Sequence, residues 1–449
     1  MSNQSAVLDE VAESVSESGP AGILGGPPER ESISPGWFRD QQRAAWAEFQ
    51  SLPMPVRKDQ AWRFSNIDAL NLAPYSGAEA LAEVDRHEIL DRSTELDNIS
   101  GRLVFADDQF LGRDVLAENL RKSGVIFQPL ERALIEHEDL FRRHFMSQPA
   151  TLGSAKFAAL HLAFVRSGTF LYVPSGVEVE LPLETFHWLH SDRVAIFPHT
   201  LLVADEFSKV TLVEHFRSTA RNRAGFSCGV NDLVVGPGAK VTYISTQDWS
   251  DSALSIQINA TTVARDASAL NLHLGLGGKY SRLESLSRLT GEGAHSDMLS
   301  VTVGEGMQEF DARTLQDHAS PHTNSDLLFK NALDGRARNT FGGLIRVEPH
   351  AHFTDAYQKV RNLLLSDDAE ANSMPGLEIL ADDVKCSHGA TSGQVEEEQM
   401  FYLLSRGIPA AVARQLLVGG FLNEVLDRLP QPPIVAKLEA LIAQKFSRR

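Results

Sequence analysis

Two metal-binding residue types stand two positions apart in the C-terminal quarter of the chain. Cys386 and His388 lie in the segment Asp382-Asp383-Val384-Lys385-Cys386-Ser387-His388-Gly389-Ala390-Thr391. A thiolate and an imidazole together suit iron or zinc. Because successive side chains of a strand point to opposite faces, both residues would point to the same side if this segment were a strand. The spacing is therefore compatible with one shared soft-metal site.

The ligand count leaves two interpretations of this pair open. A closed metal site usually takes four ligands, and the segment offers only Cys386 and His388. Either the remaining ligands come from elsewhere, or no metal binds and Cys386 is a buried structural thiol.

A second candidate is the group formed by Glu348, His350 and His352. Their alternation would place all three on one face of a strand, and two imidazoles with a carboxylate resemble the facial triad of non-haem iron enzymes. The competing interpretation is an exposed polar face. Pro349 favours the latter, because proline is disfavoured in a central strand.

The sequence lacks the motifs of two large enzyme classes. The run Gly275-Leu276-Gly277-Gly278-Lys279-Tyr280 lacks the leading glycine and the hydroxyl of a phosphate-binding loop. A βαβ glycine fingerprint for a dinucleotide is also missing. We therefore expect the chain not to hydrolyse ATP itself.

The middle of the chain has the period of β-strands. Apolar and polar residues alternate for about 200 residues after Leu160, which predicts strands. Small-residue corners recur in this region, and Ala239, Ala267 and Ala294 mark them at spacings of 28 and 27 residues. This recurrence favours coils stacked in a β-solenoid, or β-helix. A β-sandwich is the competing fold.

Helical periodicity on both sides of the β region defines the predicted domains. We expect a flexible acidic tail over residues 1–34, an N-terminal helical domain over 35–150, a β-helix core over 151–391 and a C-terminal helical domain over 392–449. Thr391 and Gln394 have the spacing of a capping box, so the first C-terminal helix should begin there. Two more helices are expected over about 409–429 and 434–446.

The C-terminal helices carry apolar stripes, which contain Phe401, Leu404, Val412, Leu416 and Leu417. Packing of such stripes on a neighbouring sheet is the default interpretation. Docking of a partner protein is the alternative.

Composition and charge limit the classes of partner. The chain has 449 residues, 43% of them apolar, and a formal net charge of -17, which disfavours nucleic acid. Its two cysteines, Cys228 and Cys386, fit a reducing compartment. Neither a secretory signal nor an apolar run long enough to span a membrane occurs. A soluble, cytoplasmic protein without membrane contact is expected.

A long, ordered set of motifs resembles the SufB/SufD family of iron-sulfur cluster assembly proteins. The resemblance covers about residues 155–430. Its motifs include Asp334-Gly335-Arg336-Ala337-Arg338, Arg361-Asn362-Leu363-Leu364-Leu365-Ser366, Lys385-Cys386-Ser387-His388-Gly389-Ala390-Thr391 and Phe401-Tyr402-Leu403-Leu404-Ser405-Arg406-Gly407.

Within this family the chain is more similar to SufD than to SufB. SufB-like chains carry a cysteine-containing segment where this chain has Ser366-Asp367-Asp368, and His-Glu where it has His388-Gly389. The segment Ala61-Trp62-Arg63-Phe64 is also similar to the N-terminal domain of SufD.

The resemblance implies a mainly β fold, a right-handed parallel β-helix core flanked by N-terminal and C-terminal helical domains. It also implies a non-catalytic scaffold in a complex with SufB and the ATPase SufC, with sulfur-donor proteins acting indirectly. The C-terminal helices would anchor one SufC subunit. The residues expected to bind partners are Phe401, Leu404, Arg406, Leu416 and Phe421.

The resemblance further implies a role for the Cys-x-His pair. His388 would ligate a nascent, transient iron-sulfur cluster at the SufB interface, with Cys386 beside it and SufB supplying the remaining ligands. A reduced flavin is linked with such complexes, but no residue of this chain identifies its site. Two alternatives are a SufB-like scaffold that acts as a homodimer and a stand-alone metalloenzyme that uses Glu348, His350 and His352.

Overall fold

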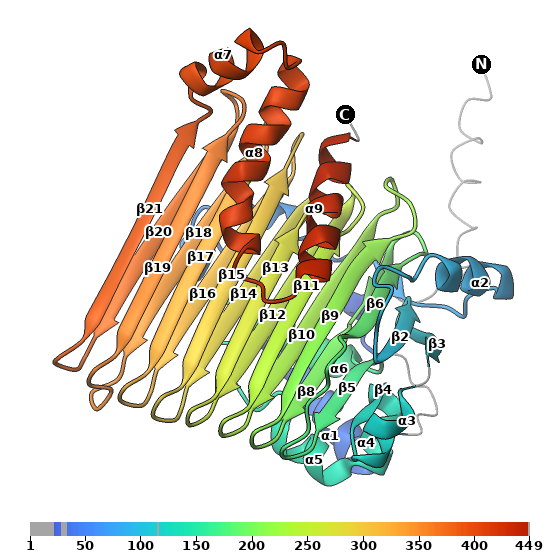
Figure 1. Ribbon diagram of the computed structural model, residues 1–449. Coiled ribbons are helices and arrows are strands. Elements are labelled where there is room, and N and C mark those ends of the chain that lie inside the picture. Colours follow the sequence, from blue (N-terminus) through green and yellow to red (C-terminus); the bar gives the residue numbers. More distant parts are fainter. Residues whose placement is uncertain (1–21, 28–33, 115, 448–449) are drawn as a thin grey trace, which may run out of the picture.

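The chain folds into two β-sheets wound into one β-solenoid, with helices near both ends of the sequence (Figure 1). The computed structural model describes residues 22–27, 34–114 and 116–447. From β8 onward, consecutive strands alternate between the two sheets, so each pair of strands forms one coil. The ladders between coils are parallel, whereas β2 with β3 and β4 with β5 are antiparallel.

The first sheet has the strand order β20-β18-β16-β14-β12-β10-β8-β5-β4. Its members are β4 (Ile126–Pro129), β5 (Gly168–Val173), β8 (His199–Ala204), β10 (Gly225–Val235), β12 (Ala253–Val263), β14 (Tyr280–Leu289), β16 (Glu309–His318), β18 (Arg338–Val347) and β20 (Glu370–Ile379), with β1 (Ser76–Gly77) and β7 (Val194–Ile196) at its side.

The second sheet has the strand order β21-β19-β17-β15-β13-β11-β9-β6-β2-β3. Its members are β2 (Gly101–Ala106), β3 (Gln109–Asp114), β6 (Leu183–Leu189), β9 (Lys209–Ser218), β11 (Lys240–Asp248), β13 (Ser268–Gly275), β15 (His295–Gly304), β17 (Asn324–Leu333), β19 (Asp355–Leu364) and β21 (Lys385–Gln394).

The recurrence of corner alanines in the sequence is the repeat of the solenoid. Ala239, Ala267 and Ala294 are all buried at the corners that precede β11, β13 and β15. The corners are stacked by backbone hydrogen bonds, since Ser268 N donates to the Ala239 carbonyl and His295 N to the Ala267 carbonyl, both at 2.9 Å. The predicted mainly β solenoid is confirmed, and the β-sandwich is excluded.

Polar side chains fill much of the interior between the two sheets. The amide of Asn231 on β10 donates to the Tyr243 hydroxyl on β11 at 2.5 Å, and Gln316 on β16 donates to Ser325 on β17 at 2.7 Å. Because a buried polar group is costly unless it is hydrogen-bonded, these pairs fix the two sheets against each other. Such inward-facing pairs therefore link one sheet to the other.

The N-terminal region was predicted to be helical but also contributes strands. Its helices are η1 (Ile23–Gly25), α1 (Gly36–Ser51), η2 (Gln60–Trp62), η3 (Ile67–Ala69), α2 (Glu83–Asp91), α3 (Glu118–Lys122), α4 (Leu130–Glu136), α5 (Glu138–His144) and α6 (Ala155–Phe164). Strands β2, β3 and β4 extend both sheets beyond the first coil. The predicted N-terminal helical domain over residues 35–150 therefore also contains strands, because pairing with β6 and β5 decides the conformation of these short apolar runs.

The predicted acidic tail falls mostly outside the described residues. Residues 1–21 and 28–33 are not among them. Ile23, within the same predicted tail, is only 1% exposed, and its amide donates to the Tyr75 carbonyl at 2.9 Å. This short segment is therefore part of the folded core.

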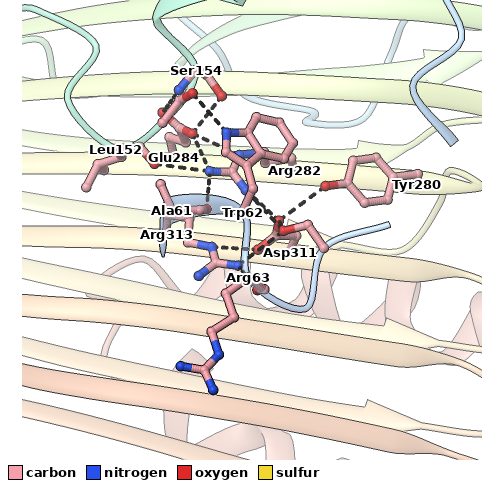
Figure 2. A network of polar contacts seen from close by, with 12 residues as sticks. Ala61, Trp62, Arg63, Leu152, Ser154, Tyr280, Arg282, Glu284, Asp311 and Arg313 are labelled. Atoms are coloured by element: carbon pink, nitrogen blue, oxygen red, sulfur yellow. Dashed lines mark hydrogen bonds and ion pairs between the residues drawn. The ribbon is translucent and has the colours of Figure 1, made fainter. Parts of the chain in front are cut away.

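A buried ionic network joins the N-terminal region to the solenoid (Figure 2). Arg282 of β14 has no exposed side-chain surface and forms ion pairs with Glu284 and Asp311. Its guanidinium also donates to the carbonyl oxygens of Ala61 and Leu152, at 3.0 and 3.1 Å. Segments far apart in the sequence are thus held by one cation.

The three C-terminal helices are α7 (Glu397–Ser405), α8 (Ala410–Leu426) and α9 (Pro432–Ser447). The last two cover the second sheet, and the helix residues buried against it include Val418, Leu422, Val425, Leu438 and Leu441. Helix α7 lies beyond the strand ends, next to β21 (Figure 1). Helices α8 and α9 therefore pack on the sheet, but not through the predicted stripe, since Val412 and Leu416 of α8 are 43% and 54% exposed.

The predicted capping box is wrong. Thr391 and Gln394 belong to β21, where they pair with Arg361 and Leu364 of β19. The Gln394 side chain donates to Asp367 at 3.2 Å instead of capping a helix. The parallel ladder with β19 therefore overrides the local helix signal, and α7 begins only at Glu397.

Candidate functional site

The two last strands of the solenoid form an open end. Within the described residues, β20 pairs only with β18, and β21 only with β19. Each therefore presents one free edge with unpaired backbone donors and acceptors, which is a template for another strand. Figure 1 shows this end on the side of the solenoid away from the N-terminal helices.

Cys386 and His388 lie at this open end, on strand β21. The ladder pairs Cys386 with Ala356 and His388 with Gln358, and both partners are buried inside the solenoid. Alternation along the strand therefore places Cys386 and His388 on the interior face. The segment is thus a strand, which was the condition for the two side chains to share one face.

The environments of the two residues differ. Cys386 packs against the apolar cluster of Ile345, Val347 and Ala356. Partial burial raises the pKa of its thiol, and the charge of Asp355 raises it further, so the protonated form dominates at neutral pH. His388 is exposed. The pair therefore consists of a partly buried, protonated thiol and an accessible imidazole.

If this end of the solenoid holds the cluster that the resemblance implies, Cys386→Ala should leave cluster assembly intact. A protonated, half-buried thiol is a poor ligand, because the thiolate is the form that binds metals. The substitution should lower the free energy of unfolding by about 1 kcal/mol through lost packing. Iron and sulfide content after reconstitution with partner proteins measures the first effect. A loss of iron as large as that of a His388 variant would show that Cys386 is a ligand.

Glu348, His350 and His352 do not form the predicted face of a strand. Strand β18 ends at Val347 and β19 begins at Asp355, so all three lie in the turn between them. His352 Nδ1 is 3.0 Å from the Asp382 carbonyl, which joins this turn to the next one. Among the residues that the structure describes, no group of three or more His, Cys, Asp or Glu side chains could hold a metal ion. The metalloenzyme alternative loses its geometric basis.

One further motif was missed by the sequence analysis. Residues Gly225-Phe226-Ser227-Cys228-Gly229 fit the G-x-S-x-G pattern of serine hydrolases. They lie inside strand β10, whereas a nucleophile elbow needs a sharp strand-to-helix turn. Ser227 is only 2% exposed. The match therefore carries no catalytic geometry.

Apolar side chains surround the open end. Leu377, Ile379 and Leu380, at the end of β20 and just after it, are 37%, 40% and 53% exposed. Large apolar groups of adjacent residues at a free strand edge favour contact with another protein. The site that contains His388 is thus bordered by a surface suited to a partner chain.

A second exposed apolar surface lies on α7 and the start of α8. Phe401 is 72% exposed, Leu404 42% and Leu416 54%. A groove of about 450 Å³ runs beside them and is lined by Leu364, Leu365, Ser366, Asp367, Gln394, Val395, Glu397, Met400, Phe401, Leu404 and Arg414. We call this the α7 surface. Unlike the inner faces of α8 and α9, it has no covering element among the described residues.

Two other predicted partner-binding residues differ in their surroundings. Arg406 is exposed, and its guanidinium lies 5.2 Å from the centre of the Tyr402 ring, so it belongs to the α7 surface. Phe421 instead packs partly buried against the second sheet. Lys330 lies over its ring at 4.5 Å and donates to its carbonyl oxygen. Phe421 thus anchors α8 to the solenoid.

No helix in the described part of the chain is long and apolar enough to cross a membrane.

The fold and the open end define a class of protein, a parallel β-solenoid with an exposed histidine beside a free strand edge. Comparison with known proteins agrees. Residues 187–421 match the SufBD core domain of SUF system FeS cluster assembly, and residues 31–185 match the SufBD protein N-terminal region. The chain belongs to the SufB/SufD family of iron-sulfur cluster assembly proteins.

Within this family the chain is most like SufD. It is 31% identical to the iron-sulfur cluster assembly protein SufD of Bacillus subtilis over 418 residues, which cover 92% of this chain and 94% of that protein. It is 29% identical to SufB of the same organism over 316 residues, which cover 70% of this chain and 68% of that protein. A SufBD family protein of Staphylococcus epidermidis is 29% identical, with 70% and 68% covered.

Proposed function

We propose that this chain is the SufD-type scaffold subunit of a SUF complex, in which His388 ligates a nascent iron-sulfur cluster shared with a SufB-type subunit. The observation that carries the proposal is the position of His388, exposed at the open end of the solenoid, where the described residues provide no group of three or more possible metal ligands. A cluster that is assembled between two chains needs only one or two ligands from each. The cluster is cargo, and the chain itself catalyses no reaction.

The free edges of β20 and β21 support pairing with a SufB-type solenoid. Edge strands with unpaired backbone groups add strands of another chain readily. The apolar residues Leu377, Ile379 and Leu380 would be buried by such pairing. The contact would also exclude water around His388, so that its imidazole meets the ligands supplied by the partner.

The α7 surface supports the anchoring of one SufC-type ATPase subunit. It is apolar and exposed, and it contains four of the five residues predicted to bind partners, Phe401, Leu404, Arg406 and Leu416. Aromatic and arginine side chains are typical of the residues that dominate binding energy. Movement of the ATPase pair would then reach the solenoid through α8, which packs on the second sheet.

Phe401→Asp is expected to weaken binding of the ATPase about 30-fold or more, the effect of losing one dominant interface residue. The reason is that a charge replaces the most exposed aromatic side chain of the α7 surface. The dissociation constant for the purified ATPase, measured by calorimetry, gives the result.

Phe207→Asp is the matched control. Phe207 is 71% exposed, against 72% for Phe401. It lies in the turn that precedes β9, on the rim where the odd-numbered strands begin, whereas α7 follows the end of β21. Equal affinities of the two variants for the ATPase would place its docking site elsewhere.

Reconstitution with SufB-type and SufC-type proteins of the same organism tests the proposal as a whole. We expect one stable complex that acquires iron and sulfide only when all three chains are present. If the intact chain binds neither partner, the scaffold role is wrong.

A homodimer is the second candidate assembly, and the same free edges favour it. Two copies could pair through β20 and β21 when no SufB-type chain is present, because an edge strand does not by itself select its partner. Light scattering of the chain alone and after addition of the SufB-type subunit separates the two. Dissociation of a dimer on addition of that subunit would show that both assemblies use one interface.

A further inference from the structure

Gln358 is a buried residue with an unused hydrogen-bond acceptor. Its side chain is 2% exposed, and its carboxamide oxygen has no partner among the described residues. An unsatisfied buried acceptor costs about 1–3 kcal/mol, so such a group in a native interior needs an explanation. The neighbour of Gln358 at the open end of the solenoid is His388.

The strand register places the two side chains next to each other. Gln358 of β19 pairs with His388 of β21, and adjacent strands lie about 4.8 Å apart. Both side chains face the interior, since Asn362, four residues after Gln358, donates to Ser392 across the same two strands at 3.0 Å. At this separation, rotation about the side-chain bonds of His388 can bring a ring nitrogen to the Gln358 oxygen.

The nitrogen of the same carboxamide is held from the opposite direction. Nε2 of Gln358 lies 3.4 Å from Oε1 of Gln316, and Gln316 is itself fixed by donating to the Tyr357 carbonyl at 3.1 Å. Gly343 of the facing sheet leaves the necessary space, because a Cβ atom there would lie 2.4 Å from Nε2 of Gln358. Because the carboxamide nitrogen of Gln358 is turned toward Gln316 and Gly343, its carboxamide oxygen is left available to accept a hydrogen bond from a side chain of β21.

We propose that Gln358 is the positioning residue of His388. Its carboxamide oxygen accepts the ring N–H that faces the interior, and the other ring nitrogen is thereby directed out of the open end toward the cluster. This inference rests on the proposed role of His388 as a ligand. Histidine ligands commonly donate their second ring N–H to an oxygen acceptor, which fixes both the tautomer and the ring orientation. Gln358 supplies that acceptor from within the same chain.

The tautomer of His388 in the isolated, full-length chain tests the positioning directly. Ring nitrogen chemical shifts are measured with ¹⁵N-labelled histidine at about pH 8, where an ordinary imidazole is neutral, and the His388 signals are assigned by their absence in His388→Ala. We expect one dominant tautomer in the wild type. Gln358→Met keeps the length of the side chain but removes the acceptor oxygen. The ratio of the two His388 tautomers should therefore move to that of a free imidazole.

Two further variants complete this measurement. Ser392→Ala removes a different interior hydrogen bond of β21 and should leave the tautomer ratio of His388 unchanged. Gln358→Glu retains an acceptor oxygen and should preserve the wild-type tautomer, which keeps the test valid if Gln358→Met fails to fold. The inference would be overturned if His388 had the same tautomer ratio in the wild type and in Gln358→Met. It would also be overturned if His388 in Gln358→Glu had the tautomer ratio of a free imidazole.

Cluster assembly gives the second readout. In the complex reconstituted with SufB-type and SufC-type proteins, Gln358→Met should retain about tenfold less iron, the lower range seen when the outer partner of a metal ligand is removed. Gln358→Glu should retain more iron than Gln358→Met. Normal iron content in His388→Ala would disprove the ligand role itself, whereas an unchanged tautomer in Gln358→Met disproves only the positioning.

Discussion

Replacement of His388 by alanine is expected to abolish cluster assembly by the reconstituted complex while the solenoid stays folded. His388 is exposed at the open end of the solenoid and makes no side-chain hydrogen bond within the described residues. Removal of such a side chain usually changes the free energy of unfolding by no more than about 0.5 kcal/mol. Loss of a residue that ligates the cluster directly should lower the iron content by more than roughly tenfold, the effect of losing only a hydrogen-bond partner of such a ligand.

Ser387→Ala provides the matched control for this experiment. Ser387 is the neighbour of His388 on β21 and is also exposed, but alternation points its side chain to the outer face. Its removal should leave iron and sulfide content at the wild-type level. Normal assembly by His388→Ala would remove the ligand role, and unfolding of that variant would instead show that the imidazole supports the structure.

The solenoid repeat could be predicted from the sequence because it is a local property. Each coil has the same small-residue corner. Ala239, Ala267 and Ala294 therefore recur at the sequence spacing that separates paired residues of successive coils in the strand ladders. The common face of Cys386 and His388 could be expected for the same reason once the segment was taken as a strand, since alternation requires no knowledge of the partner strand.

The errors arose where pairing over long distances decides the structure. Thr391 and Gln394 have a helical signal, but the ladder to β19 keeps them in a strand. Glu348, His350 and His352 also alternate as in a strand, but they fall in the turn between β18 and β19, in agreement with the effect expected of Pro349. In both cases the competing conformations are similar in local preference, and the hydrogen bonds of the neighbouring coil select one.

The residues that support the candidate site could not be predicted from the sequence. Gln358 becomes relevant to His388 only through the register of β19 and β21, which are separated by 30 residues. The remaining ligands of a shared cluster belong to another chain under the proposed function. Under that proposal, a complete ligand set is not to be expected within this sequence.

The ionic network around Arg282 gives the largest stability effect that we expect. Its guanidinium is 3.7 Å from the centre of the Trp62 ring and bonds Glu284, Asp311 and the Ala61 carbonyl (Figure 2). Burial opposes the charged form, but Asp311 and Glu284 more than compensate, and they raise the pKa of Arg282. The arginine is therefore charged in the folded state.

Arg282→Met is expected to lower the free energy of unfolding by about 3–5 kcal/mol, because removal of one partner leaves buried carboxylates without compensation. Asp311 retains Arg313 as a partner at 2.8 Å, so the uncompensated charge falls mainly on Glu284. Urea denaturation gives the change in free energy, and hydrogen exchange of residues 60–66 shows where protection is lost. We expect the greatest loss at this segment, since Arg282 and Arg313 hold its backbone carbonyls.

Arg265→Met separates the effect of burial from the effect of removing a salt bridge. Arg265 pairs with Glu292 at 2.7 Å, similar to the distance in the Arg282 pair, but its side chain is 63% exposed. An exposed pair of this kind contributes at most about 1 kcal/mol, so this variant should unfold close to the wild type. Equal losses in the two variants would contradict the argument that the network clamps the N-terminal region onto the solenoid. A large loss confined to Arg282→Met would establish that the region carrying Trp62 and the β-solenoid fold as one unit.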